Sequence, residues 1–439
     1  MVKKDNVIKD PATIQSTSGI PKISEIGTSL KFDEDEKNRL KKLADRVAEI
    51  AALPVQKEKA ILWKKHNDLK TSEPLVFIDP ENGWNEIIPA DTLLCREPLA
   101  RVWEMYLLKQ IYWFEHLKDD KVIEAFLDVP YSYHDTGWGT ELKKRSRGAD
   151  GAYKIIPVLE DYEEDLPKLH YPRILVDYDE SERLMELAQE IFGGILTVRR
   201  RTNWWWSMGL TEYYINLRGL ENFMCDFLTE PEAIHQTMRM LCDGALGLLD
   251  FLEENQLLAY NSEGTYVGAG GFGYTDFLPS WSGGKVNVTA MDMWGFVESQ
   301  ETVAINPELY GEFIYPYHEE IAKRFGLNCY GCCEPYDPRW KYVKKLTRLR
   351  KVSCSPWSDW STIKPNLGKD YIASIKPTPT SLATAHMDED FVRKEVRRAL
   401  ICSEGCIPEI IMKDNHTLGH CPKNASRWVE LAREEISRF

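Results

Sequence analysis

Apolar residues recur at helical spacing through the first part of the chain. Residues 33–51 place four of them on one face, which predicts an amphipathic helix: Leu40, Leu43, Val47 and Ile50. The same spacing predicts helices over 54–69 and 97–117. We expect residues 31–121 to form a helical N-terminal extension. The polar residues 1–30 are expected to form a flexible arm.

From residue 122 the pattern changes to short apolar runs separated by helical stretches. The runs predict strands over 122–129, 173–176, 195–198, 257–260, 296–297, 327–330, 351–354, 371–375 and 409–412. Helices are predicted over 180–192, 230–254, 307–325, 338–346, 388–400 and 424–438. Repeated strand–helix units are typical of a parallel sheet covered by helices, and their number favours an α/β fold with a (β/α)8 TIM-type barrel over residues 122–439. The glycine-rich segment 268–273 lacks the P-loop lysine and is predicted to be a flexible loop.

Composition narrows the classes of partner. The chain has 439 residues, a net charge of -14 and a pI near 5.3. Such an acidic surface argues against nucleic acid as a partner. No apolar run approaches the ~18 residues of a membrane span, and the N-terminus lacks the apolar core of a secretory signal. The 10 cysteines are therefore expected to be reduced thiols of a cytoplasmic protein that does not contact the membrane.

The segment Tyr330-Gly-Cys-Cys-Glu-Pro335 is the strongest candidate for chemistry. It follows the predicted strand 327–330, and in a barrel the carboxyl ends of all strands face one mouth. Thiolates and carboxylates are ligands for zinc, so Cys332, Cys333 and Glu334 are candidate metal ligands. Two alternatives remain open: the thiols fill apolar space beside a turn, or one of them is a catalytic nucleophile.

The predicted last strand adds polar residues to the same mouth. His416 is a further candidate zinc ligand, and Asp414 is a candidate catalytic acid or base. Lys413 is expected to form an ion pair with Asp414. Glu298 follows the predicted strand 296–297 and is the second candidate catalytic carboxylate, with a solvated helix start as its alternative.

Tryptophans supply the candidate substrate contacts. Trp204, Trp205 and Trp206 follow the predicted strand 195–198, and Trp357 follows the strand 351–354. Three consecutive tryptophans do not all fit on one face of a core, so at least one is expected to line the mouth or a partner surface. Packing beneath a long loop is the alternative.

These segments together carry a resemblance. Glu298-Ser-Gln-Glu-Thr, Tyr330-Gly-Cys-Cys-Glu-Pro, Ser355-Pro-Trp-Ser-Asp and Glu409-Ile-Ile-Met-Lys-Asp are similar to uroporphyrinogen decarboxylase-like barrel proteins, in particular the corrinoid-dependent methyltransferase branch. The resemblance spans most of residues 75–439. It implies a (β/α)8 barrel with zinc at its mouth. The branch that uses coenzyme M carries His-x-Cys with a distant Cys, whereas Tyr330 stands two residues before Cys332 here.

The resemblance implies a zinc-dependent methyltransferase. The enzyme would move a methyl group from a small methylated substrate, such as an aryl methyl ether or a methylamine, to the cobalt of a separate corrinoid protein. A cofactor-free decarboxylase acting on a porphyrinogen-like polycarboxylate is the first alternative. A non-catalytic corrinoid-binding or scaffolding protein is the second.

Overall fold

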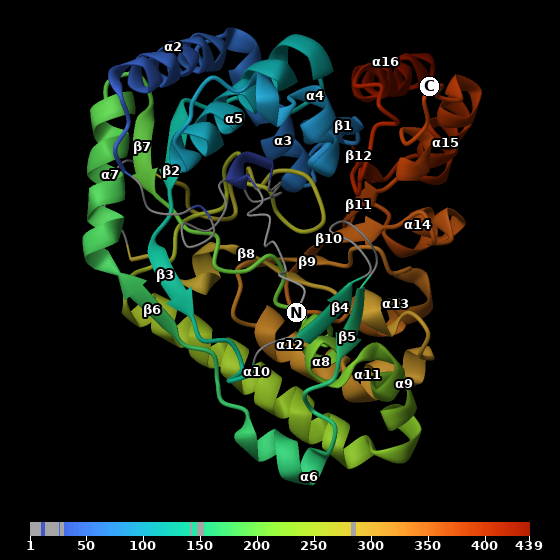
Figure 1. Ribbon diagram of the computed structural model, residues 1–439. Helices are drawn as coiled ribbons and strands as arrows, with labels where there is room; N and C mark the ends of the chain where they lie inside the picture. The colour runs from blue at the N-terminus through green and yellow to red at the C-terminus, as the bar shows by residue number, and fades with distance from the viewer. Residues whose placement is uncertain (1–9, 14–25, 27–29, 141–142, 147–152, 282–286) are drawn as a thin grey trace.

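A computed structural model describes residues 10–13, 26, 30–140, 143–146, 153–281 and 287–439 (Figure 1). The predicted arm over residues 1–30 lies mostly outside the described residues.

The main sheet has six parallel strands. Their spatial order is β8 (Trp294–Val297), β9 (Leu327–Tyr330), β10 (Leu349–Cys354), β11 (Ile372–Ile375), β12 (Ile407–Met412) and β1 (Leu75–Ile78). All four residues of β1 are buried, as expected for a strand covered on both faces. The range 31–121, predicted as a helical extension, thus contributes a strand to the main sheet.

Three smaller strand pairs complete the β-structure of the described residues. β2 (Phe126–Val129) pairs in parallel with β7 (Thr197–Arg200). β3 (Ser132–Asp135) pairs antiparallel with β6 (Ile174–Asp177), and β4 (Lys143–Ser146) with β5 (Tyr153–Ile156). The strand predicted over 173–176 therefore exists, but it belongs to an antiparallel pair outside the parallel sheet.

The residues predicted as a strand over 257–260 form no strand. The side chain of the next residue, Asn261, takes the place of a strand neighbour. It accepts the backbone N–H of Trp294 at 2.8 Å and donates to the carbonyl of Trp294 at 2.9 Å. The fold is thus mixed α/β with a parallel sheet, and no strand ladder between described residues joins β2 and β7 to it.

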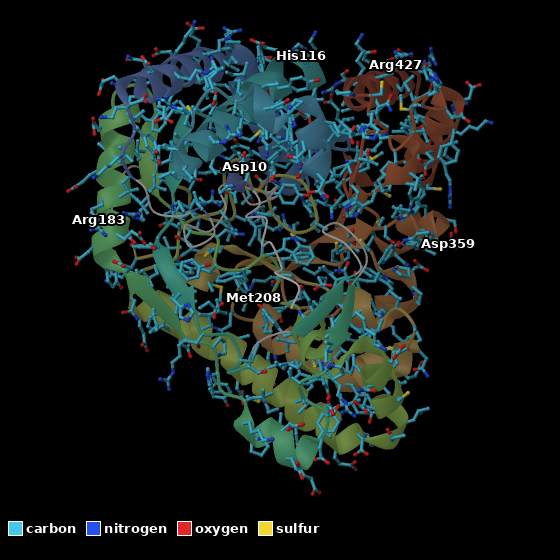
Figure 2. All side chains as sticks on the ribbon, viewed as in Figure 1. Asp10, His116, Arg183, Met208, Asp359 and Arg427 are labelled. Carbon is cyan, nitrogen blue, oxygen red and sulfur yellow. The ribbon has the colours of Figure 1, made fainter. Side chains whose placement is uncertain are left out.

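Helices cover the sheet and form most of the outer surface in Figure 1. The longer ones are α2 (Glu34–Ala51), α3 (Pro54–Asn67), α5 (Pro98–Tyr112), α7 (Tyr178–Phe192), α8 (Thr211–Arg218), α9 (Leu220–Thr229), α10 (Pro231–Glu254), α12 (Tyr315–Ala322), α15 (Glu389–Cys402) and α16 (Lys423–Arg438). Shorter helices are α4 (Trp84–Ile87), α6 (Tyr162–Asp165), α11 (Pro307–Phe313), α13 (Trp340–Val343) and α14 (Ile363–Asn366). Side chains fill the space between these helices and the sheet (Figure 2).

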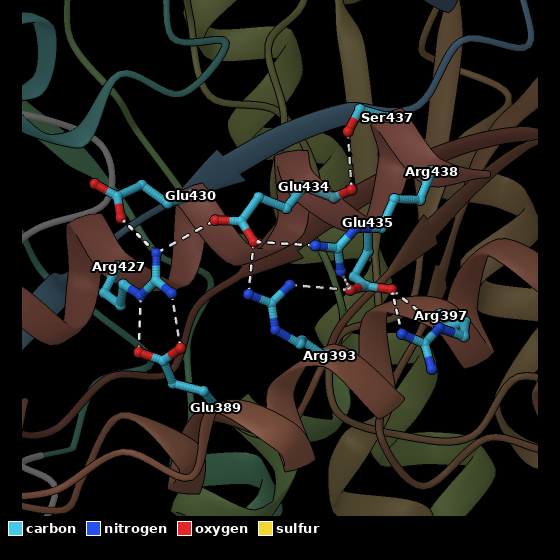
Figure 3. Close-up of polar contacts among 9 residues, drawn as sticks. All are labelled: Glu389, Arg393, Arg397, Arg427, Glu430, Glu434, Glu435, Ser437 and Arg438. Carbon is cyan, nitrogen blue, oxygen red and sulfur yellow. Dashed lines mark hydrogen bonds and ion pairs between the residues drawn. The ribbon is translucent and has the colours of Figure 1, made fainter.

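An ion-pair network joins α15 to α16 (Figure 3). Glu435 is its centre, because the guanidinium groups of Arg393, Arg397 and Arg438 lie 2.7 to 3.0 Å from its carboxylate. The side chain of Glu435 is only 2% exposed, so these contacts hold a buried charge. Buried charges are stable only when they are paired in this way.

The glycine-rich segment 268–273 forms a loop, as predicted, and this loop is buried. A Cβ on Gly271 would lie 2.6 Å from Lys351 Nζ, and φ is +90° there, so a side chain is excluded twice. Lys351 Nζ in turn lies 3.0 Å from the Glu409 carboxylate, which His66 also contacts at 3.3 Å. Glycine therefore lets the backbone pass close to a buried charge cluster.

None of the helices that the structure describes is both long enough and apolar enough to cross a membrane.

Candidate functional site

The two thiols and the end of β12 meet beyond the carboxyl ends of β9 and β12. Cys332 Sγ lies 3.7 Å from Cys333 Sγ, and Cys333 Sγ lies 3.6 Å from Asp414 Oδ2. Lys413 Nζ lies 3.6 Å from Cys332 Sγ and 2.8 Å from Asp414 Oδ1. The predicted ion pair between Lys413 and Asp414 is thus confirmed. Cys332 contacts its lysine and Cys333 contacts its aspartate.

Backbone turns at both strand ends produce this meeting. Gly331 has φ +86° and Asp414 has φ +61°, both in the left-handed region. Glycine adopts that region freely, and aspartate tolerates it better than most residues. The turns bring side chains more than 80 positions apart in the sequence into contact.

The Cys332 side chain has one polar and one apolar neighbourhood. On the apolar side it packs in a small cluster with Trp294, Phe296 and Cys329. The hydrogen bond with Cys333 and burial together raise the pKa of the Cys332 thiol well above its ordinary value. Ligation of a metal by Cys332 would therefore release a proton and depend on pH.

Glu334 forms its hydrogen bonds with backbone N–H groups. Its carboxylate accepts the backbone N–H of Ser299 at 2.8 Å and that of Cys332 at 2.9 Å. It is fully buried, and it holds the loop after β9 against the loop after β8. The structure thus gives Glu334 a positioning role for Cys332.

His416 stands apart from the thiols. It is exposed, and its Nδ1 lies 3.4 Å from Asn82 Nδ2. The intervening residue Asn415 is buried and donates to the Asp79 carbonyl at 2.7 Å, which directs the chain away from the thiols.

Zinc fits the thiol pair but not the whole predicted ligand set. Two thiolates that share a tetrahedral zinc, with Zn–S near 2.3 Å, lie roughly 3.8 Å apart. The 3.7 Å between Cys332 and Cys333 meets this requirement. Within the described ranges, no three His, Cys, Asp or Glu side chains are grouped as a ready-made metal site. Asp414, whose Oδ2 lies 3.6 Å from Cys333 Sγ, is a further oxygen donor beside the pair.

Glu298 lies behind the thiols, at the end of β8. It is fully buried, accepts the backbone N–H of Gln300 at 3.1 Å and lies 3.4 Å from Ser207 Oγ. Burial and the neighbouring carboxylates of Glu301 and Glu334 raise its pKa well above the ordinary value. A raised pKa favours the protonated carboxyl, which is the form that a general acid uses.

The tryptophans divide between packing and exposure. Trp204 donates to the Leu257 carbonyl at 3.1 Å, and the ring of Trp205 packs against Phe325. Trp206 is 37% exposed and contacts Phe296 of the apolar cluster around Cys332. Trp357 is 77% exposed. The three consecutive tryptophans line a small cavity that Tyr266 also lines.

A second cavity, of ≈ 160 Å³, lies on the other side of Tyr266, between α5 and the strands β1, β2 and β7. Asp79, which follows β1, is part of its wall. Burial raises the pKa of Asp79, and its Oδ1 accepts the backbone N–H of Glu81 at 3.0 Å. Because β1 was predicted as part of a helical extension, the sequence pattern alone did not place Asp79 at the mouth.

Tyr266 joins this cavity to the thiol site. Its hydroxyl is buried and has no hydrogen-bond partner among the residues described. Burial raises its pKa well above the ordinary value, and the charges of Lys413 and Asp79 act on it as well. A buried hydroxyl without a partner is costly to a fold unless a ligand completes it. No motif around Tyr266 marked it in the sequence.

No protein-family model and no curated protein matches the chain. Solved structures do match, among them a methyltransferase from Methanosarcina mazei. That match has 10% sequence identity, covers 68% of this chain and 76% of that chain, and has a TM-score of 0.39. A likeness of this size carries no argument about function, so the chemistry rests on the residues themselves.

Proposed function

We propose that the protein is a zinc-dependent methyltransferase that moves a methyl group from a small methylated substrate to the cobalt of a separate corrinoid protein. The observation that carries the proposal is the thiol pair, Cys332 and Cys333, at zinc-ligand spacing beside the Lys413–Asp414 ion pair. Zinc held there would act as a Lewis acid on the heteroatom that loses the methyl group.

The chain's own residues supply proton chemistry at this place. The Tyr266 hydroxyl, which has no partner among the described residues, is free to donate a hydrogen bond to the leaving oxygen or sulfur. The charges of the neighbouring Lys413 and Asp414 act on this hydroxyl. Donors fixed where negative charge develops stabilise that charge without reorganising.

We also propose that the parallel strands form a closed (β/α)8-type barrel. Contacts at both edges of the main sheet support closure. At the β1 edge, Asp120 N–H donates to the Val76 carbonyl at 2.8 Å just before β2. At the β8 edge, Asn261 binds both backbone groups of Trp294, and Met208 N–H donates to the Phe296 carbonyl at 2.8 Å.

The cavity argues against the decarboxylase alternative. Its ≈ 160 Å³ is close to the ~150 Å³ that holds one benzene ring in an engineered protein cavity, and a porphyrinogen is a tetrapyrrole. The arginines in its wall are also engaged: Arg199 and Arg201 both bind Asp128. They are therefore not free to hold a polycarboxylate.

Metal analysis of the purified protein tests the proposal. We expect about one zinc per chain, and we expect the double variant Cys332→Ser, Cys333→Ser to lose both the zinc and methyl transfer to a corrinoid protein. Cys329→Ser is the matched control, because Cys329 stands at CxxC spacing before Cys332 but lies within strand β9, ahead of the loop that carries the thiol pair. Zinc retention in the double variant, or a wild-type protein that binds no zinc, would overturn the proposal.

A further inference from the structure

Aromatic rings form much of the wall of the ≈ 160 Å³ cavity. Those in its lining include Phe77, Trp84, Trp113, Phe126 and Phe272. A cavity of this size accommodates one six-membered ring, and flat aromatic walls favour a flat ligand.

Cations of the protein already lie over these rings. Lys109 Nζ lies 5.6 Å from the centre of the Trp84 ring, and Lys121 Nζ lies 4.6 Å from that of Trp113. Lys121 also lies 4.8 Å from the centre of Phe272, and the Arg199 guanidinium carbon lies 4.1 Å from that of Phe126. A methylammonium ligand binds in an aromatic cage by the same cation–π attraction. In this cavity a methylammonium group would meet four rings that protein cations already contact.

Most of the carboxylates near these cations are committed to other partners. Asp128 is bound by two arginines, and Glu124 accepts the Tyr274 hydroxyl at 2.8 Å. Asp119 accepts the backbone N–H of Ile78 and that of Lys121, each at 3.0 Å. Their negative charges are thereby partly satisfied before any ligand enters.

Lys121 differs from Arg199 and Arg201 in forming no ion pair with a carboxylate of the described residues. Within the part of the chain that the structure describes, no Asp or Glu oxygen lies within the 4.0 Å of an ion pair with its Nζ. Burial lowers the pKa of Lys121, and the charges of Asp119, Glu124 and Asp79 only partly oppose that effect. An anion that reaches Lys121 would oppose that effect further.

We propose that Lys121 binds the negatively charged group of the substrate, and that the substrate is a single-ring aromatic acid carrying a methyl ether or thioether. Its ring would lie among the aromatic walls, with the opposite end toward Tyr266. Only the methyl ether or thioether of this substrate rests on the proposed function; the ring and the negative charge are inferred from the cavity. The same cations would repel the ammonium group of a methylamine.

Equilibrium binding measured by tryptophan fluorescence and calorimetry tests this inference without zinc or a corrinoid protein. The probes are 4-methoxybenzoate, 4-methoxybenzamide and (4-methoxyphenyl)trimethylammonium, which share the ring and differ in charge. We expect the carboxylate to bind roughly 10- to 100-fold more tightly than the amide, as for a hydrogen bond to a charged group. The ammonium compound should show no binding at the concentrations at which the carboxylate and the amide bind.

Variants locate the effect. Lys121→Gln should abolish the preference for the carboxylate over the amide, whereas Lys121→Arg should keep it. Lys57→Gln is the control, because Lys57 is exposed on α3. Equal binding of the three probes, or an unchanged preference in a folded Lys121→Gln protein, would overturn the inference. Either result would leave the zinc and methyl-transfer measurements untouched.

Discussion

His318 gives a sharp test of how burial controls stability in this fold. It lies in α12 behind the site, is fully buried, and neither ring nitrogen has a hydrogen-bond partner among the described residues. Burial, and secondarily the charge of Arg339, lower its pKa from 6.5 to about 3. The imidazole is therefore neutral in the folded protein over most of the acidic range.

The sign and size of the effect follow from proton linkage. Below pH 6.5 the unfolded chain takes up a proton at His318, whereas the folded chain does not until pH nears 3. The contribution of neutral His318 to the free energy of unfolding is complete above pH 6.5 and is lost progressively as the pH falls toward 3. At about pH 5, 1.5 pH units below 6.5, the loss is about 2 kcal/mol.

Urea unfolding at about pH 7.5 and about pH 5 measures this loss. We expect the wild type to lose about 2 kcal/mol more between these conditions than His318→Phe, which keeps a ring and cannot titrate. His318→Leu separates any packing effect of the larger ring. His386→Phe is the control, because His386 is exposed. An identical pH dependence in the wild type and both His318 variants would show that the reasoning about burial is wrong.

Two further predictions concern the site and the helix pair. Tyr266→Phe should lower kcat by roughly 100-fold, as expected for loss of a hydrogen-bond donor to developing negative charge, while thermal unfolding shows equal or greater stability, because a buried hydroxyl without a partner is removed. A stability loss with unchanged kcat would contradict this. Glu435→Gln should cost about 3 kcal/mol in chemical unfolding, because three arginines lose their buried partner, whereas Glu430→Gln at the exposed edge of the network should cost less than about 1 kcal/mol. Equal costs would refute the distinction.

The sequence predicted the elements better than their connections. The apolar run 327–330 coincides with β9 and 409–412 lies within β12, because a short apolar run is consistent with a buried strand. The run 257–260 looks the same but forms no strand, since a side-chain amide of Asn261 occupies the position of the missing ladder. β1 was missed because its four residues lie between long helical stretches.

The candidate site was predictable where residue type and strand end coincide, as for Cys332, Cys333 and Asp414. His416 lies only two residues beyond Asp414, but the backbone turn at Asp414 and the buried Asn415 separate it from the thiols. Tyr266 and Lys121 carry no motif. Their importance comes from neighbours distant in the sequence, which only the folded chain brings together.

The contact between Asn415 and Asp79 spans 336 positions of the chain, and β1 pairs with β12 in the same place. Closing a loop of that length is slow and cannot begin before the late strand has left the ribosome. Thiols, tyrosine and cavity wall therefore come together last during synthesis. The nascent protein would stay inert, and its reactive sulfurs unassembled, until almost all of the remaining architecture stands.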